Sequence, residues 1–143
     1  QNMLQVLKIS PLWQKAFYQD PSVISSAKTL EMATIDGAKA VFKEREIGSL
    51  EQGKQADFFI FNPKRAGTVP IADPIVSLVY CADASNIETT VVAGKVVYNQ
   101  GKVMGIDEED LLDRVQSHAI RLWEKTGLEV QQWGQLMAFN RFK

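Results

Sequence analysis

The sequence predicts an α+β protein, because it has helical patterns towards both ends and β-strand patterns between them. Residues 3–18 and 25–42 carry apolar residues at the three- and four-residue spacing of amphipathic helices. Residues 86–104 are rich in β-branched residues and contain glycines, which is typical of a hairpin. The 143 residues, 45% apolar and 23% charged, are enough for one globular domain with its own core.

The first helical pattern, over residues 3–18, contains a proline that we expect to interrupt it. Pro11 lacks the N–H that a helix interior needs, so a second helix is expected to begin there with Ser10 as its N-cap. The pattern stops at Asp20 and Pro21, a pair that commonly ends one segment and opens another.

Residues 25–42 are predicted to form two short helices. Gly37 lies inside this pattern and costs about 1 kcal/mol relative to alanine, so it indicates a helix break or a close contact. A break gives one helix to about residue 34 and a second over residues 35–42. The charged, glycine-containing residues 43–55 then predict a turn-rich connector.

Two segments are predicted to be strands, with a short helix between them. Phe58–Phe61 is an apolar run bounded by polar residues and Pro63, which is typical of a buried strand. Asp73 is expected to cap a short helix that begins at Pro74. Residues 86–104 predict a hairpin followed by a third short strand.

The most regular helical pattern covers residues 107–125. Asp107 is expected to cap this helix and Gly127 to end it. The apolar tail that follows, with its basic end, is expected to pack on the domain or on a partner, or to fray. The apolar stripe of the helix consists of Leu111, Leu112, Val115, Ala119, Leu122 and Trp123.

Charge and composition exclude several classes of function. A net charge of −1 offers no basic surface for nucleic acid or for an acidic membrane. No apolar run approaches the roughly 20 residues that span a bilayer, and the N-terminus does not have the pattern of a signal peptide. The one cysteine excludes an internal disulfide and fits a reducing compartment, so we expect a cytoplasmic protein.

No set of residues matches a catalytic, metal-binding or phosphate-binding motif. The one histidine, His118, is expected to be a structural residue of the last helix, because a zinc site needs several converging ligands. Cys81 is expected to be a small buried residue rather than a nucleophile. Glu44, Glu46 and Glu51 are expected to form a solvated face rather than an acid–base pair. We therefore predict no catalytic, cofactor-binding or metal-ligating residue in this chain.

Two blocks of the sequence resemble the region that follows the catalytic barrel in metal-dependent amidohydrolases. The first, residues 30–62, has an ATxxGA helix and an IGSLExGKxAD segment before an apolar strand; the family commonly has Asp where this chain has Asn62. The second, residues 73–104, has a DPxxxLVYxA helix and a hairpin with a GKVV strand. The matching positions are Ala33, Thr34, Gly37, Ala38, Ile47, Gly48, Gly53, Lys54, Ala56 and Asp57, then Asp73, Pro74, Leu78, Val79, Tyr80, Ala82, Val91, Gly94, Lys95, Val96, Val97 and Gly101.

The resemblance implies that the chain is an α+β fragment of such an enzyme. It implies that residues 1–46 are the last helices of a (β/α)8 barrel, that residues 47–104 are part of a small β-sandwich side domain, and that residues 105–143 are a C-terminal helix and tail. The chain looks most like the branch that contains cytosine, guanine and methylthioadenosine deaminases and triazine chlorohydrolases. It begins without Met and within a helical pattern, which indicates a piece of a longer polypeptide, although a processed or engineered start is the alternative.

In that branch, zinc or iron is held by barrel histidines and by an Asp at the end of the eighth strand, and a metal-activated water attacks the ring. None of these ligands can be carried over, because all of them would precede Gln1. The resemblance therefore implies a scaffolding role, no cofactor in this chain, and a small-molecule substrate only for the intact enzyme. The alternative is a stand-alone interaction or dimerisation module of the same fold; a complete enzyme would need a site that the sequence does not show.

The resemblance also gives physical roles to single residues. Gly48 and Gly53 suit tight turns that lead the chain out of the barrel, and Asp57 is expected to accept hydrogen bonds from backbone donors before the strand. Strands that lack their neighbours leave unpaired edges and exposed apolar faces. We therefore expect the chain to associate with the missing N-terminal barrel segment or with a second copy of itself, as a homo-oligomer.

Overall fold

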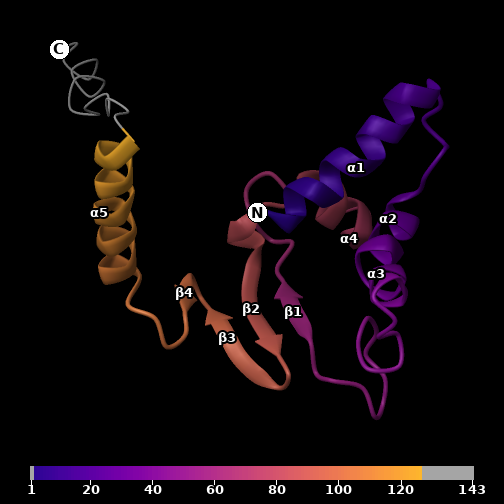
Figure 1. Cartoon of the computed structure of the whole chain (residues 1–143). Coiled ribbons are helices and arrows are strands. Elements are labelled where there is room, and N and C mark those ends of the chain that lie inside the picture. The colour runs from indigo at the N-terminus through magenta and orange to yellow at the C-terminus, as the bar shows by residue number, and fades with distance from the viewer. Residues whose placement is uncertain (1, 127–143) are drawn as a thin grey trace. The chain divides into compact units, whose positions relative to one another are not determined.

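The computed structural model describes residues 2–126, which belong to two compact units (Figure 1). Unit 1 is Gln1–Met104 and unit 2 is Gly105–Lys143. Unit 1 combines helices with a four-stranded antiparallel sheet, and the described part of unit 2, up to residue 126, contains one helix. The chain is therefore a mixed α+β protein, as the sequence predicts. The assignment of residues 1–46, 47–104 and 105–143 to parts of a larger enzyme stays a prediction.

Helix α1 (Met3–Tyr18) runs through Pro11 without a break, so the predicted interruption is wrong. The side chain of Pro11 is less than 2% exposed. Burial of this ring against the rest of unit 1 offsets the hydrogen bond that a proline removes from a helix. The helix is capped by Asn2 rather than by Ser10, because the Oδ1 atom of Asn2 accepts a hydrogen bond from the backbone N–H of Leu4 at 3.1 Å.

Helices α2 (Ser26–Ala33) and α3 (Ile35–Ala40) confirm the prediction of two short helices. They are separated at Thr34, three positions before the glycine that suggested a break. Gly37 lies inside α3 and makes a close contact instead, because a Cβ atom there would lie 3.3 Å from the carbonyl oxygen of Met32.

A small ion-pair network joins α2 to α3. The Nζ atom of Lys28 lies 2.6 Å from Oδ2 of Asp36, and the Nζ atom of Lys39 lies 3.0 Å from Oδ1 of the same carboxylate. The hydrogen bond from Lys28, and then the one from Lys39, lower the pKa of Asp36 below its ordinary value of 3.8. The same contact with Asp36, together with that of Glu31, raises the pKa of Lys28.

We expect the Asp36→Asn variant to lose part of the acid dependence of folding stability. Because the pKa of Asp36 is lower in the folded chain, its contribution is fully present above the ordinary pKa and is lost as the pH falls through the lowered one. The two lysines are half exposed or more and Asp36 is 30% exposed, so solvent screens the pairs and the effect is small. Thermal unfolding from about pH 2 to about pH 7, with Asp113→Asn in unit 2 as the control, checks this; identical curves for Asp36→Asn and the unsubstituted chain would contradict it.

The sheet contains β1 (Phe58–Phe61), β2 (Ile87–Val92), β3 (Lys95–Asn99) and β4 (Lys102–Val103), in that order across the sheet (Figure 1). The predicted hairpin and third short strand are confirmed. The β2–β3 turn has Ala93 at φ 48° and Gly94 at φ 74°. Two positive φ angles in a two-residue loop match the twist of the flanking strands, as in a type I′ turn.

Strand β1 lies where the sequence predicts it, but the prediction that it is buried is wrong. Phe58, Phe59 and Ile60 are 37%, 40% and 46% exposed. The strand order places β1 at the edge of the sheet, where it pairs only with β2 among the described residues. An apolar run therefore predicted the strand correctly, while its burial depends on neighbours that the run itself does not specify.

Helix α4 (Pro74–Val76) continues into a π-helical turn over Ser77–Cys81. The predicted cap is confirmed, since Oδ1 of Asp73 accepts a hydrogen bond from the N–H of Ile75 at 2.7 Å. In the π-turn, the N–H of Ala82 donates to the carbonyl oxygen of Ser77 at 2.9 Å. Cys81 is exposed, so its predicted burial is wrong. Leu78 and Val79 are the residues of this turn that enter the core, together with Ser77.

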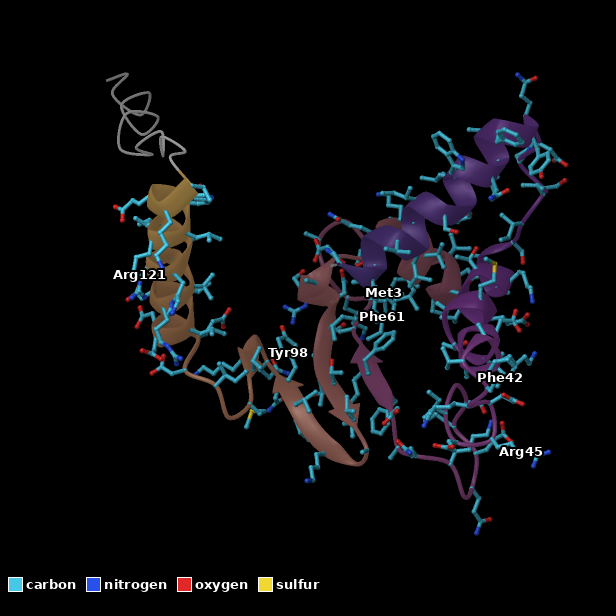
Figure 2. The ribbon with its side chains drawn as sticks, viewed as in Figure 1. Met3, Phe42, Arg45, Phe61, Tyr98 and Arg121 are labelled. Atoms are coloured by element: carbon cyan, nitrogen blue, oxygen red, sulfur yellow. The ribbon has the colours of Figure 1, made fainter. Side chains whose placement is uncertain are left out.

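The apolar core of unit 1 joins the helices to the sheet. Leu4 and Leu7 of α1 pack with Leu78 of the π-turn. Partly buried side chains surround this cluster, including Phe61 at the end of β1 (Figure 2) and Ile87 at the start of β2. The core therefore lies where α1, the π-turn and one end of the sheet meet.

A buried polar cluster lies beside the apolar core, around Asn86. This side chain is 1% exposed. Its Oδ1 atom accepts a hydrogen bond from the N–H of Asp83 at 3.0 Å, and its Nδ2 atom donates to the carbonyl oxygen of Asn62 at 2.9 Å and to Oγ1 of Thr68 at 3.3 Å. One amide thus connects the start of β2 with the loop that follows β1.

Unit 2 contains helix α5 (Glu108–Thr126). Its predicted cap is confirmed, since Oδ1 of Asp107 accepts a hydrogen bond from the N–H of Asp110 at 3.1 Å. None of the described residues of α5 is buried, so its apolar stripe is accessible in this chain. The predicted helix end at Gly127 and the tail lie outside the described residues. Over residues 2–126, no helix is both long and apolar enough to cross a membrane.

Candidate docking site

A groove of about 670 Å³ lies on unit 1 between helices α2 and α3 and the sheet. Apolar side chains form most of its walls, and several of them are exposed in this chain. A mostly apolar hollow of this size marks a place where a ligand or another polypeptide surface can be buried. Helices α2 and α3 contribute Leu30 and Ala38, Val41 follows α3 directly, and the sheet contributes Phe58, Phe59 and Val91.

The shape of the groove depends on the close approach of the connector to α3 at Gly48. This residue has a φ of +93°, and a Cβ atom there would lie 2.7 Å from Cβ of Ala38 and 3.0 Å from Cα of Ile35. Only glycine fits both the backbone conformation and the space. Gly53 has a φ of +94° but is surrounded by open space. Both glycines therefore have the positive φ that the predicted tight turns use, and Gly48 has a packing role as well. That these turns lead the chain out of a barrel stays a prediction.

Asp57 fastens the end of the β2–β3 hairpin to β1, at the rim of the groove. Its Oδ1 atom accepts a hydrogen bond from the N–H of Ala93 at 2.6 Å. Next to it, the N–H of Gly94 donates to the carbonyl oxygen of Ala56 at 3.1 Å. This confirms the expectation that Asp57 accepts from backbone donors, and it identifies the donor as the hairpin turn.

Helix α1 carries a second apolar stripe away from its core residues. Its members Trp13 and Phe17 are 67% and 69% exposed, while Met3 and Val6, at its start, line a hollow towards α2. A helix with apolar residues on two faces is typical of a helix covered on both sides. The outer stripe consists of Met3, Val6, Ile9, Trp13 and Phe17.

The described residues bring no candidate cluster of metal ligands together. Over residues 2–126, no three side chains of the types His, Cys, Asp and Glu come together as metal ligands would. His118 is exposed on α5, with its Nδ1 atom 2.7 Å from the carbonyl oxygen of Arg114. Cys81 belongs to the other unit. The expectation that His118 and Cys81 are structural residues stays a prediction.

The three connector glutamates differ in their surroundings. Glu46 and Glu51 are exposed, as predicted, and pair with Lys43 and Lys54. Glu44 is only half-exposed, so a fully solvated face is wrong for this residue. No group in the described part of the chain donates a hydrogen bond to its buried Oε2 atom. Nothing in the sequence distinguishes Glu44 from its neighbours, because its burial comes from the folding of the connector.

The sequence pattern that defines the amidohydrolase family matches residues 1–97. The chain belongs to the amidohydrolase family, as its two sequence blocks predict. The 5-methylthioadenosine/S-adenosylhomocysteine deaminase of Pyrococcus horikoshii is 33% identical over 113 residues, which are 79% of this chain and 26% of that protein. The deaminase of the same name from Desulforudis audaxviator is 35% identical over 123 residues, which are 86% of this chain and 29% of that protein.

Solved structures also match this chain over only part of their length. An adenosine deaminase from Xanthomonas campestris with bound zinc superposes with a TM-score of 0.80 and 28% identity, over 83% of this chain and 27% of that chain. The atrazine chlorohydrolase of Arthrobacter aurescens, complexed with zinc, superposes with a TM-score of 0.72 over 80% of this chain and 25% of that chain. At 22% identity, the second likeness shows the fold alone. The chain spans about a quarter of the length of the relatives that it matches.

Proposed function

We propose that this chain is the C-terminal structural portion of a metal-dependent amidohydrolase that hydrolyses a C–N or C–Cl bond of a heteroaromatic ring. The observation that carries the proposal is the superposition on the Xanthomonas adenosine deaminase, which includes 83% of this chain but only 27% of that chain. The names of the relatives, which are deaminases and a chlorohydrolase, support hydrolysis at a ring carbon as the reaction class.

In this proposal the chain completes the enzyme rather than carrying its chemistry. Residues 1–46 are the last helices of the barrel, residues 47–104 are part of a β-sandwich side domain, and residues 105–143 are the terminal helix and tail. The exposed surfaces support this arrangement, because the groove, the edge of β1 and the outer stripe of α1 are apolar and accessible in this chain. The N-terminal barrel segment is the partner that covers them.

The metal of the intact enzyme, zinc or iron, is held by residues other than those described. The donor set supports this part of the proposal, because the described residues bring together no three ligands. The residues present therefore do not fit a metal site, and no catalytic step is assigned to any of them.

The proposal is tested by determining the complete reading frame and assaying its product. We expect the intact protein to contain metal and to hydrolyse one of a set of purines, pyrimidines and triazines. The 143-residue chain, purified in the same way, is expected to do neither, because it lacks the ligands. Stoichiometric zinc in the 143-residue chain, measured by atomic absorption, would overturn the proposal, as would an intact protein without metal-dependent hydrolysis.

A stand-alone interaction or dimerisation module is the second candidate function. The apolar groove and the outer stripe of α1 favour it equally well, since two copies of the chain can bury such surfaces in a homo-oligomer. An in-frame start codon immediately upstream of Gln1, together with a dimer in sedimentation equilibrium, would favour this module over the enzyme.

A further inference from the structure

One side-chain contact joins α1 to the π-turn across a long stretch of sequence. The Nζ atom of Lys15 donates a hydrogen bond to the hydroxyl of Tyr80 at 3.0 Å, between residues 65 positions apart. The same ammonium lies 5.3 Å from the centre of the tyrosine ring, at its hydroxyl end. A partly buried hydrogen bond from a charged donor is stronger than an exposed neutral one.

The contact holds the half of α1 that the apolar core leaves unsupported. Before Pro11, the helix is fixed by Leu4 and Leu7, which pack on Leu78. After Pro11, which removes one helical hydrogen bond, Lys15 reaches the π-turn. This wider turn changes the direction in which its side chains leave the helix axis, compared with an α-helix, and Tyr80 meets Lys15 there.

We propose that Lys15 and Tyr80 form a positioning pair that fixes the rotation of α1 and so aligns its outer stripe with the remaining amidohydrolase polypeptide. This inference rests on the proposed function and names the contact that prepares the docking surface. Trp13 and Phe17, the most exposed residues of the outer stripe, lie two positions before and two positions after Lys15. They belong to the same half of the helix as Lys15 but point away from it. A change in the rotation of this half moves both aromatic side chains together.

The occupant of the outer stripe is the part of the protein that this chain does not contain. The family pattern includes all of α1, since it matches residues 1–97, and the relatives are about four times as long as the matched region. Their additional length supplies a surface large enough to cover the outer stripe. A second copy of the chain is the competing occupant, and the experiment below distinguishes the two.

Hydrogen exchange of the α1 amides, measured by mass spectrometry, tests the inference in two proteins: the product of the complete reading frame and the 143-residue chain. We expect slower exchange of α1 in the intact protein, because docking protects it. Tyr80→Phe keeps the ring but removes the hydroxyl, and Lys15→Met removes the donor. Each is expected to accelerate exchange after Pro11 about tenfold in the intact protein and about twofold in the chain alone.

Two further variants show whether the effect belongs to the pair. Lys15→Arg keeps a cationic donor and is expected to restore slow exchange. Lys8→Met removes an exposed lysine from the same helix and is expected to have no effect beyond its neighbours. Because Lys15 and Tyr80 act through one contact, the double variant is expected to resemble either single variant rather than to multiply their effects.

The possible results separate this inference from the proposed function. Three results would overturn the positioning pair and leave the proposed function intact. They are equal acceleration of hydrogen exchange in the intact protein and in the 143-residue chain, fast exchange in the Lys15→Arg variant, and an effect of Lys8→Met as large as that of Lys15→Met. If α1 of the unsubstituted sequence exchanges equally fast in the two proteins, the additional polypeptide does not cover the outer stripe. This result would overturn both the positioning pair and the proposed function. A reading frame that begins at this chain would do the same. Protection of α1 that appears only at dimer-forming concentrations would assign the stripe to a second copy.

Discussion

Replacing Asn86 by alanine is expected to destabilise unit 1 by about 3 kcal/mol or more. The amide is 1% exposed and makes three side-chain hydrogen bonds. Its removal leaves the backbone N–H of Asp83 and the carbonyl oxygen of Asn62 without their partner in a place that water does not easily reach. A buried polar group without a partner costs about 1–3 kcal/mol, so the losses together exceed those of most single substitutions.

Urea unfolding followed by circular dichroism measures this effect. Asn99→Ala is the matched control, because this asparagine is exposed and accepts one hydrogen bond, from Oγ1 of Thr89 at 3.2 Å. The control is expected to change stability by about 0.5 kcal/mol or less. A similar free energy of unfolding for the two variants would show that the buried amide is not a main support of unit 1.

Replacing Gly48 by alanine is expected to cost about 3 kcal/mol or more, through two separate causes. The first is backbone strain, because alanine must adopt a φ of +93°. The second is overlap, because the new Cβ atom would lie 2.7 Å from Cβ of Ala38 and 3.0 Å from Cα of Ile35. Neither neighbour is the end of a flexible side chain, so relief requires the connector to move away from α3.

Gly53→Ala separates the two causes. Its φ of +94° imposes the same strain, but a Cβ atom there meets nothing within 4 Å. We expect this control to cost about 1–2 kcal/mol, from strain alone. The difference in unfolding free energy between the two variants therefore measures the close approach at Gly48. Equal losses would contradict the argument that the connector packs tightly on α3.

The sequence predicted those features of the fold that depend on local chemistry. Asp73 and Asp107 were recognised as caps because a carboxylate before a helical pattern can accept from its first N–H groups. The hairpin was recognised from its β-branched residues and turn glycines. Predictions that depended on distant neighbours were wrong: α1 continues through Pro11, whose burial offsets the lost hydrogen bond, and Cys81 is exposed.

The candidate docking site was predicted only in part, because local motifs indicate some of its residues while its shape depends on distant neighbours. Gly48 and Asp57 were expected to serve turns and backbone donors, which a motif can indicate. The groove itself was not predictable, because its walls combine residues between 30 and 41, from α2, α3 and the positions that follow them, with strand residues 58–59 and 90–92. The contact between Lys15 and Tyr80 joins residues 65 positions apart, and no periodic pattern relates them.

The hydrogen bond between Asp57 and the hairpin turn has a consequence for how β1 finds its place on β2. A strand that slips by one residue exchanges the two faces of its side chains, and in most strands the alternation of apolar and polar residues prevents this. Phe58–Phe61 is apolar throughout, so slipped and correct alignments would bury similar side chains. Polar contacts at the two ends of the strand can select the alignment instead. At one end the carboxylate of Asp57 accepts from the N–H of Ala93 at 2.6 Å, and at the other the N–H of Asn62 donates to the carbonyl oxygen of Asn86 at 2.7 Å.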